Sequence, residues 1–223
     1  KENAAQIRLS GQFSSCWAGM LIDVEGTSTL EQVFTKANSD WQKALGISDP
    51  VEVRLLVEDL GGSTLGTAEI TKLDAKGLPQ TAIIRLDDNA AGAGWFADLT
   101  GSLVPTDSYD LYTVLLHELG HAYGMTLSYS GFSTGLTETA EGFTFAISTG
   151  EQVVLDSTVQ HLSDSYVDDL MVDELSPGVR KSLSRLDVQV VAQAQKNGYG
   201  SGYLLDGTAY LSATGASVES GTA

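Results

Sequence analysis

The sequence predicts an α+β domain in which a mixed sheet lies above helices, and two kinds of periodicity indicate this class. Segments 28–45, 107–124 and 184–197 repeat apolar residues at helical spacing, whereas segments 51–58 and 80–87 alternate as strands do. Most expected strands precede the second helix, and irregular chain and a terminal helix follow it. We therefore expect the sheet above a cleft and the helix-rich second half below it.

The first half is expected to hold one helix among several strands. In segment 28–45, Ser28 or Thr29 can cap the start and Gly46 can end the helix. Its apolar face consists of Leu30, Val33, Phe34, Ala37, Trp41 and Leu45. Strands are expected at 6–10, 51–58, 66–73 and 80–87, before a Gly-rich segment at 89–97.

The second half is expected to contain two helices and a hairpin. Asp107 or Ser108 is the expected N-cap of helix 107–124, Asp110 suits the positive end of its dipole, and Gly124 can end it. The hairpin spans 143–156 and turns near Gly150. In helix 184–197, Ser184 and Asp187 have the spacing of a capping box.

One domain is expected over residues 1–205, with an upper lobe at about 1–124 and a lower lobe at about 125–205. Residues 206–223 are small and polar, which is typical of a linker. Because the chain starts at Lys1 without an apolar leader, we interpret it as part of a longer precursor, secreted or extracellular and of bacterial type. We expect it to be a monomer.

The charge and composition exclude some partners. The net charge is −17, from 29 acidic and 12 basic residues, which argues against nucleic acid and anionic membranes. No apolar run approaches the roughly 20 residues that cross a bilayer. The acidity indicates solubility outside the cell or, alternatively, Ca²⁺ binding. Cys16 is the single cysteine and, in its apolar surroundings, is expected in the core rather than as a catalytic thiol.

The sequence HELGH at 117–121 is the strongest motif. Residues four apart on a helix share one side, so His117 and His121 can direct both imidazoles at one ion. Glu118 is rotated by about 100° yet can reach a water bound to that ion. This pattern predicts a Zn²⁺ site in which Glu118 serves as general base.

A catalytic zinc needs a third protein ligand. The chain has three histidines, and the remaining one, His161, lies 40 positions beyond His121 across the expected hairpin. We therefore predict His161 as the third ligand. The alternative is a carboxylate, Glu141 or the nearby Glu138, but the short Gly-bounded segment around them does not favour the helix on which such a ligand usually stands.

The sequence HELGHAYGMTL at 117–127 resembles the metzincin clan of zinc peptidases. Gly124 matches the glycine at which the clan's chain turns beneath the metal, whereas Leu127 stands where the compact motif has its third ligand. The chain is similar to a leishmanolysin-like variant in which an insertion delays that ligand. By this resemblance His161 is the delayed histidine and Met171 is the packing methionine of the turn below the zinc.

Segment 85–124 also resembles matrixin-type domains of large bacterial secreted proteins, and the resemblance as a whole extends over about residues 80–205. It implies a twisted mixed sheet above the active-site helix and a C-terminal helix below the cleft. It also implies a protein or peptide substrate that binds extended along an edge strand. Segment 89–97 is either that strand or a surface loop.

Two positions around this expected site are less defined. Some relatives carry a tyrosine two residues after the methionine as an extra metal contact or an oxyanion-stabilising group. This chain has Asp173 there, so no such residue is assigned, and Tyr166 is a candidate by its proximity in sequence alone. Asp87, Asp88 and Asp98 flank the Gly-rich segment, where they form either a calcium site or, as we favour, a solvated acidic loop.

The sequence thus predicts a zinc-dependent endopeptidase that uses Glu118 to activate water. One alternative is a non-catalytic, zinc-stabilised module of a large secreted or adhesive surface protein, motivated by Leu127. Another is an enzyme that releases its parent protein by self-cleavage. Retention of Glu118 favours catalysis, because a structural zinc does not need that carboxylate.

Overall fold

The computed structural model describes residues 6–9, 24–25 and 28–200. The strands are β1 (Gln6–Leu9), β2 (Val24–Glu25), β3 (Glu52–Glu58), β4 (Gly66–Leu73), β5 (Pro79–Asp87), β6 (Trp95–Phe96), β7 (Tyr109–Asp110), β8 (Leu136–Thr139), β9 (Gly142–Ala146) and β10 (Gln152–Val154). The helices are α1 (Leu30–Leu45), α2 (Leu111–Ala122), α3 (Ser130–Ser133) and α4 (Arg185–Gly198), with a 3-10 turn at Asp164–Tyr166. Cys16 and the tail 206–223 lie outside the described residues.

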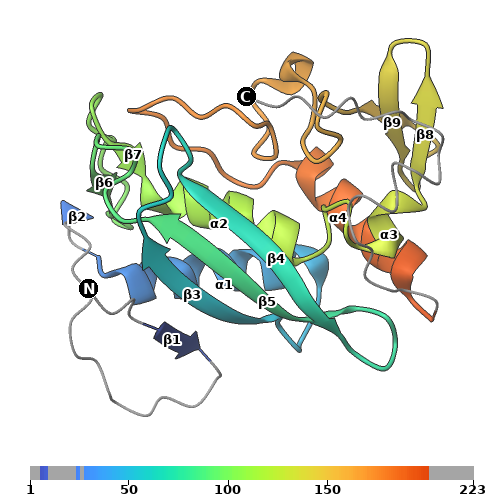
Figure 1. Cartoon of the computed structure of the whole chain (residues 1–223), viewed down its shortest axis with the longest axis horizontal. Coiled ribbons are helices and arrows are strands. Elements are labelled where there is room, and N and C mark those ends of the chain that lie inside the picture. The colour runs from blue at the N-terminus through green and yellow to red at the C-terminus, as the bar shows by residue number, and fades with distance from the viewer. Residues whose placement is uncertain (1–5, 10–23, 26–27, 201–223) are drawn as a thin grey trace.

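A four-stranded mixed sheet forms one layer of the molecule, in the order β1-β3-β5-β4 (Figure 1). The central strands β3 and β5 run parallel, while the outer strands β1 and β4 are antiparallel to their neighbours. This arrangement confirms the predicted α+β class and the strands expected at 51–58, 66–73 and 80–87. Since β4 is the last strand in the order, no strand of the described residues pairs with its second edge.

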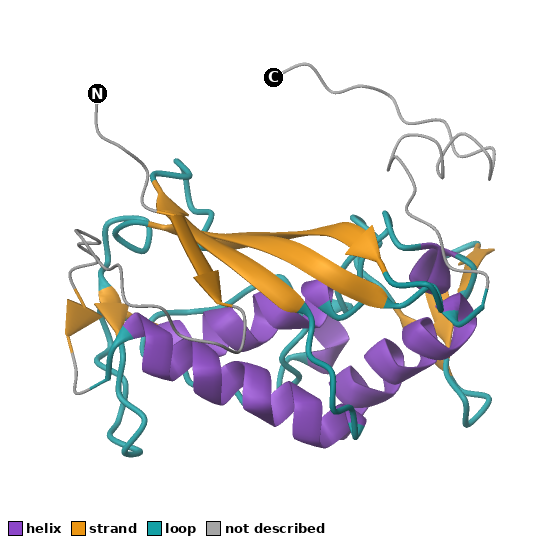
Figure 2. Ribbon diagram, turned by 90° about the horizontal axis from the view of Figure 1, so that it is seen from below, coloured by secondary structure: helices purple, strands orange, loops and turns teal. Residues whose placement is uncertain are grey.

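Helices α1 and α2 pack together beneath this sheet (Figure 2). Trp41 of α1 is fully buried and donates its indole N–H to the carbonyl of Leu116 in α2, at 2.8 Å. Thr29 caps α1 in a capping box with Gln32, and Gly46 ends it with φ 67°. The predicted helix and its caps are therefore confirmed, and its buried face holds α2 in place.

The start of α2 differs from the prediction. Asp110, rather than Asp107 or Ser108, is the N-cap and accepts the N–H of Thr113. The helix begins later because residues 109–110 form strand β7, which pairs in parallel with β6. The predicted end is correct, since the helix stops before Gly124, whose φ of 133° favours glycine.

Asp110 is fully buried and is held by an ion pair with Arg180. The guanidinium donates to both carboxylate oxygens, at 3.0 and 2.6 Å, and to the carbonyl of Asp98 at 2.7 Å. These bonds tie the start of α2 to the chain that precedes α4. Because Asp110 has no exposed surface, its charge depends on these partners.

Replacing Arg180 with Met is expected to destabilise the fold by about 3 kcal/mol, because it leaves the buried Asp110 carboxylate without its cation. The control is Arg85→Met, which removes two partly exposed ion pairs, with Glu58 and with Glu69, and should cost less than about 1 kcal/mol. Urea unfolding of both variants measures the difference. Equal losses would show that the buried pair contributes no more than a surface one.

After α2 the described chain forms one small sheet, the short helix α3, which was not expected, and helix α4. The predicted hairpin is confirmed as β9 and β10, and β8 adds a third antiparallel strand that was not expected. Helix α4 starts at the predicted Ser184–Asp187 capping box and packs against α3 and α1. Within the described residues, the longest helix has 16 residues, and none combines the length and apolarity needed to cross a membrane.

Candidate metal centre

Two histidines of α2 form the first part of the centre. His117 and His121 stand one turn apart, and their Nε2 atoms are 3.1 Å from each other. The helix cannot rotate, because Leu111, Leu115 and Leu119 are fully buried in the core. Both imidazoles therefore face the same point on the cleft side of α2.

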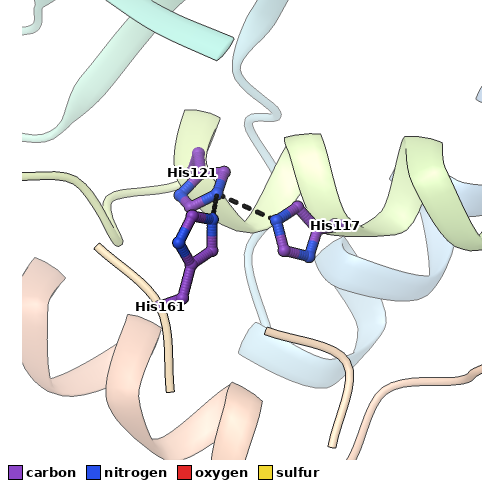
Figure 3. A group of neighbouring side chains, drawn as sticks. All are labelled: His117, His121 and His161. Atoms are coloured by element: carbon purple, nitrogen blue, oxygen red, sulfur yellow. Dashed lines mark hydrogen bonds between the residues drawn. The ribbon is translucent and has the colours of Figure 1, made fainter. Parts of the chain in front are cut away.

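His161 completes the group from a distant segment, the chain after β10 (Figure 3). Its Nε2 lies 3.2 Å from Nε2 of His121, and one nitrogen from each of the three rings lies within 4.8 Å of the others. The structure thus brings together the three histidines that the sequence singled out, with the nitrogens facing one another rather than solvent. Among the described residues, this is the one group of such side chains arranged to hold a metal ion.

The opposite nitrogen of each ring is held by an oxygen atom. Nδ1 of His117 lies 3.0 Å from the carbonyl of Leu170, and Nδ1 of His121 lies 2.6 Å from that of Met125. Nδ1 of His161 lies 3.4 Å from the carboxylate of Asp156. Acceptors at Nδ1 place the ring proton there, which leaves the lone pairs of the three Nε2 atoms directed at one another.

Burial opposes protonation of two of these rings. It lowers the pKa of His117 to about 4, together with the nearby His161, and lowers the pKa of His121 well below its usual range. Neutral imidazoles with converging lone pairs suit a cation. Asp156, which holds His161, has its pKa lowered to about 2, because hydrogen bonds from His161 and Thr158 outweigh the effect of its burial.

Glu118 follows His117 on α2 and lines the same cleft as the three histidines, although its side chain is almost entirely buried. It is 5% exposed, and its Oε2 has no hydrogen-bond partner among the described residues. The side chain passes beneath β4, where a Cβ on Gly66 would come within 2.8 Å of its Cγ. Burial raises the pKa of Glu118 to about 8. Glycine at position 66 thus provides the room that this carboxylate occupies.

The raised pKa of Glu118 makes the stability of the metal-free protein depend on pH. The unfolded chain releases this proton near pH 4.5, whereas the folded chain retains it to about pH 8, so stability falls as pH rises through this window. We expect metal-free wild type to lose stability relative to metal-free Glu118→Gln between those limits. Urea midpoints of both proteins test this, and a constant difference would contradict it.

Met171 packs directly beneath the centre. A Cβ on Gly120 would lie 2.3 Å from Sδ of Met171, so the methionine contacts the backbone of α2 between the two helical histidines. It is fully buried, as the packing role predicted for it requires. The neighbouring Leu170 supplies the carbonyl that holds His117. This turn therefore determines the orientation of a ring in the centre.

Asp187 holds this turn in place, a role that its capping position did not suggest. Its carboxylate accepts the N–H groups of Leu170 and Met171 at 3.1 and 3.0 Å, as well as that of Ser184 at 2.8 Å. Asp187 is fully buried. One carboxylate therefore caps α4 and fixes the turn beneath the histidines.

Replacing Asp187 with Asn is expected to cost about 2 kcal/mol of stability, because the amide turns a donor towards one of these N–H groups. The displaced carbonyl of Leu170 should also weaken metal binding, by about tenfold to a hundredfold. Urea unfolding and a zinc titration measure the two effects. Asp168→Asn, an exposed carboxylate of the same segment, is the control and should change neither.

A cleft of about 760 Å³ runs past the histidines and Glu118. One wall is the loop before β4 and the start of that strand, residues 63–68, and the other is formed by residues 170–177. The edge strand beside the cleft is therefore β4. Segment 89–97 was one candidate for that strand, but it turns and pairs through β6 with β2 and β7 instead.

The other residues considered from sequence lie elsewhere or have structural partners. Glu138 and Glu141 are exposed in β8 and in the turn after it, outside the histidine group. The hydroxyl of Tyr166 accepts the N–H of Val154. The carboxylates of Asp87 and Asp98 accept backbone N–H groups of their own loops, which gives them a structural role. Oδ1 of Asp88 is buried without a hydrogen-bond partner, and among the described residues these three carboxylates do not form a group arranged to hold a metal ion.

Comparison with protein-family models found no match, and comparison with curated proteins and with solved structures found none either.

Proposed function

We propose that the protein is a zinc-dependent endopeptidase of the metzincin type. The observation that carries this proposal is the convergence of three Nε2 atoms next to a buried carboxylate, within a cleft that a polypeptide can enter. Each part has a role in hydrolysis of a peptide bond: three neutral ligands, one general base and one binding surface.

The geometry of the histidines fits zinc. Bonds of about 2.0–2.1 Å in a tetrahedron place ligand nitrogens roughly 3.3 Å apart. The Nε2 atoms of His117 and His161 lie 3.1 and 3.2 Å from that of His121, so small movements suffice. Each Nδ1 already has an oxygen partner, as is usual for histidines that bind zinc. With three protein ligands, one position stays open.

A zinc ion bound there would polarise a carbonyl group and lower the pKa of water. Glu118 then takes the proton of the attacking water and later delivers it to the leaving amine. Its buried position serves both steps, because few groups compete for the carboxylate.

The substrate is a protein or peptide in extended conformation. The start of β4 lies along one wall of the cleft, directly above Glu118, and no other described strand pairs with the outer edge of β4. Main-chain pairing with that edge would hold a polypeptide across the histidines with little dependence on its sequence. We extend the proposal to an extracellular setting, which suits the net charge of −17.

The alternative, a non-catalytic module stabilised by zinc, is opposed by Glu118. A structural site gains nothing from a buried carboxylate with an unpartnered oxygen, which is costly to retain. Casein cleavage distinguishes the two. We expect wild type to cleave casein, a chelator to abolish cleavage, and added zinc to restore it. Zinc binding without cleavage would favour the module.

A further inference from the structure

Asp173 faces the metal side of the centre. Its Oδ1 lies 3.8 Å from Nε2 of His161, the nitrogen that converges with those of the other histidines. The Nδ1 side of the same ring is occupied by Asp156. The two carboxylates therefore stand at different ends of one imidazole, and Asp173 is at the end where a metal would bind.

Backbone bonds keep Asp173 at this location. The N–H of Leu162 donates to the carbonyl of Met171 at 2.8 Å, and Leu162 forms a parallel bridge with Val172. Residues 161–162 and 171–173 are thus paired side by side. The side chain of Asp173 is 64% exposed and lines the cleft, so it can rotate although its backbone is fixed.

We infer that Asp173 is a fourth, displaceable ligand of the metal, an inference that rests on the proposed zinc site. A carboxylate oxygen sharing a tetrahedral zinc with His161 would lie about 3.3 Å from its Nε2. Oδ1 of Asp173 lies 3.8 Å from Nε2 of His161 but outside the group in which the three histidine nitrogens lie within 4.8 Å of one another, so the exposed side chain has to rotate to reach the ion. Carboxylate oxygen is an ordinary zinc ligand.

Binding of Asp173 to the metal would change the net charge of the centre and the access of other ligands to the ion. Three neutral imidazoles leave the full charge of a divalent ion, and one carboxylate halves the net charge. The same carboxylate occupies the position that water or a substrate carbonyl needs. Asp173 therefore raises metal affinity while it competes with any ligand that enters from the cleft.

Cobalt substitution tests this without reference to peptidase activity. The visible spectrum of bound Co²⁺ reports the number and kind of its ligands, so the spectrum of Asp173→Ala should differ from that of wild type. Acetohydroxamate, a small chelating ligand, should bind the cobalt protein about tenfold more tightly once the competing carboxylate is gone. Glu174→Ala removes the next carboxylate and the same charge, and is the matched control.

The outcomes distinguish failure of the role inferred for Asp173 from failure of the proposed metal site. A changed spectrum and tighter acetohydroxamate binding in Asp173→Ala, with Glu174→Ala like wild type, would support the inference. Cobalt binding with wild-type spectrum and affinity in Asp173→Ala would overturn it and leave the proposed peptidase intact. Failure of wild type to bind cobalt at one site per chain would overturn both.

Discussion

Replacing Glu118 with Gln should lower casein cleavage by a factor of about 10² to 10⁴, with zinc content unchanged. Glutamine has nearly the same shape, so it fits beneath Gly66, where the space is limited. It cannot take a proton from water at neutral pH. The three histidines keep their positions, because Glu118 makes no bond to them among the described contacts.

The measurement compares initial rates of casein cleavage at equal zinc loading. Glu138→Gln, which alters an exposed carboxylate in β8, is the control and should match wild type. If Glu118→Gln retained more than about a tenth of the activity, another base would have to act and the mechanism would be wrong. If zinc were lost together with activity, Glu118 would be a structural or ligating group instead.

Replacing His161 with Ala is expected to remove most of the bound zinc and the activity together. A site reduced from three protein ligands to two binds zinc far more weakly, and the remaining pair on α2 holds it no better than an exposed His-x-x-x-His pair would. Zinc titration in the presence of a competing chelator should show a loss of affinity of at least about a hundredfold.

The control for this change is Glu141→Ala, which removes the carboxylate that competed with His161 for the role of third ligand. Glu141 is exposed in the turn between β8 and β9, so its replacement should leave zinc binding and cleavage as they are. Full zinc affinity in His161→Ala would show that the centre uses a ligand from another part of the chain. Loss of zinc in Glu141→Ala would contradict the structure directly.

Local patterns in the sequence were sufficient to predict helices α1, α2 and α4 and strands β1, β3, β4 and β5 of the large sheet, but not the short helix α3. Thr29 with Gln32 and Ser184 with Asp187 form capping boxes within three residues, so short-range spacing reveals them. The HELGH motif is equally local, because one helical turn decides which side His117 and His121 share. His161 was identified differently, as the one histidine left for a site that needs three ligands.

Long-range contacts account for what sequence patterns missed. The true N-cap Asp110 is selected by the pairing of β7 with β6 and by Arg180, which lies 70 residues away. The spacing of Asp187 predicts a helix cap only, yet its carboxylate also accepts the N–H of Met171, which lies 16 residues away in sequence. The edge strand beside the cleft could not be chosen before the order β1-β3-β5-β4 was known. Such roles depend on tertiary pairing, which local spacing does not encode.

A crystal structure of the zinc-loaded protein, with anomalous diffraction recorded on both sides of the zinc absorption edge, tests whether the three histidines bind zinc. We expect one anomalous peak, about 2.0–2.1 Å from Nε2 of each of His117, His121 and His161. A peak at any other group of side chains, or none at saturating zinc, would contradict it.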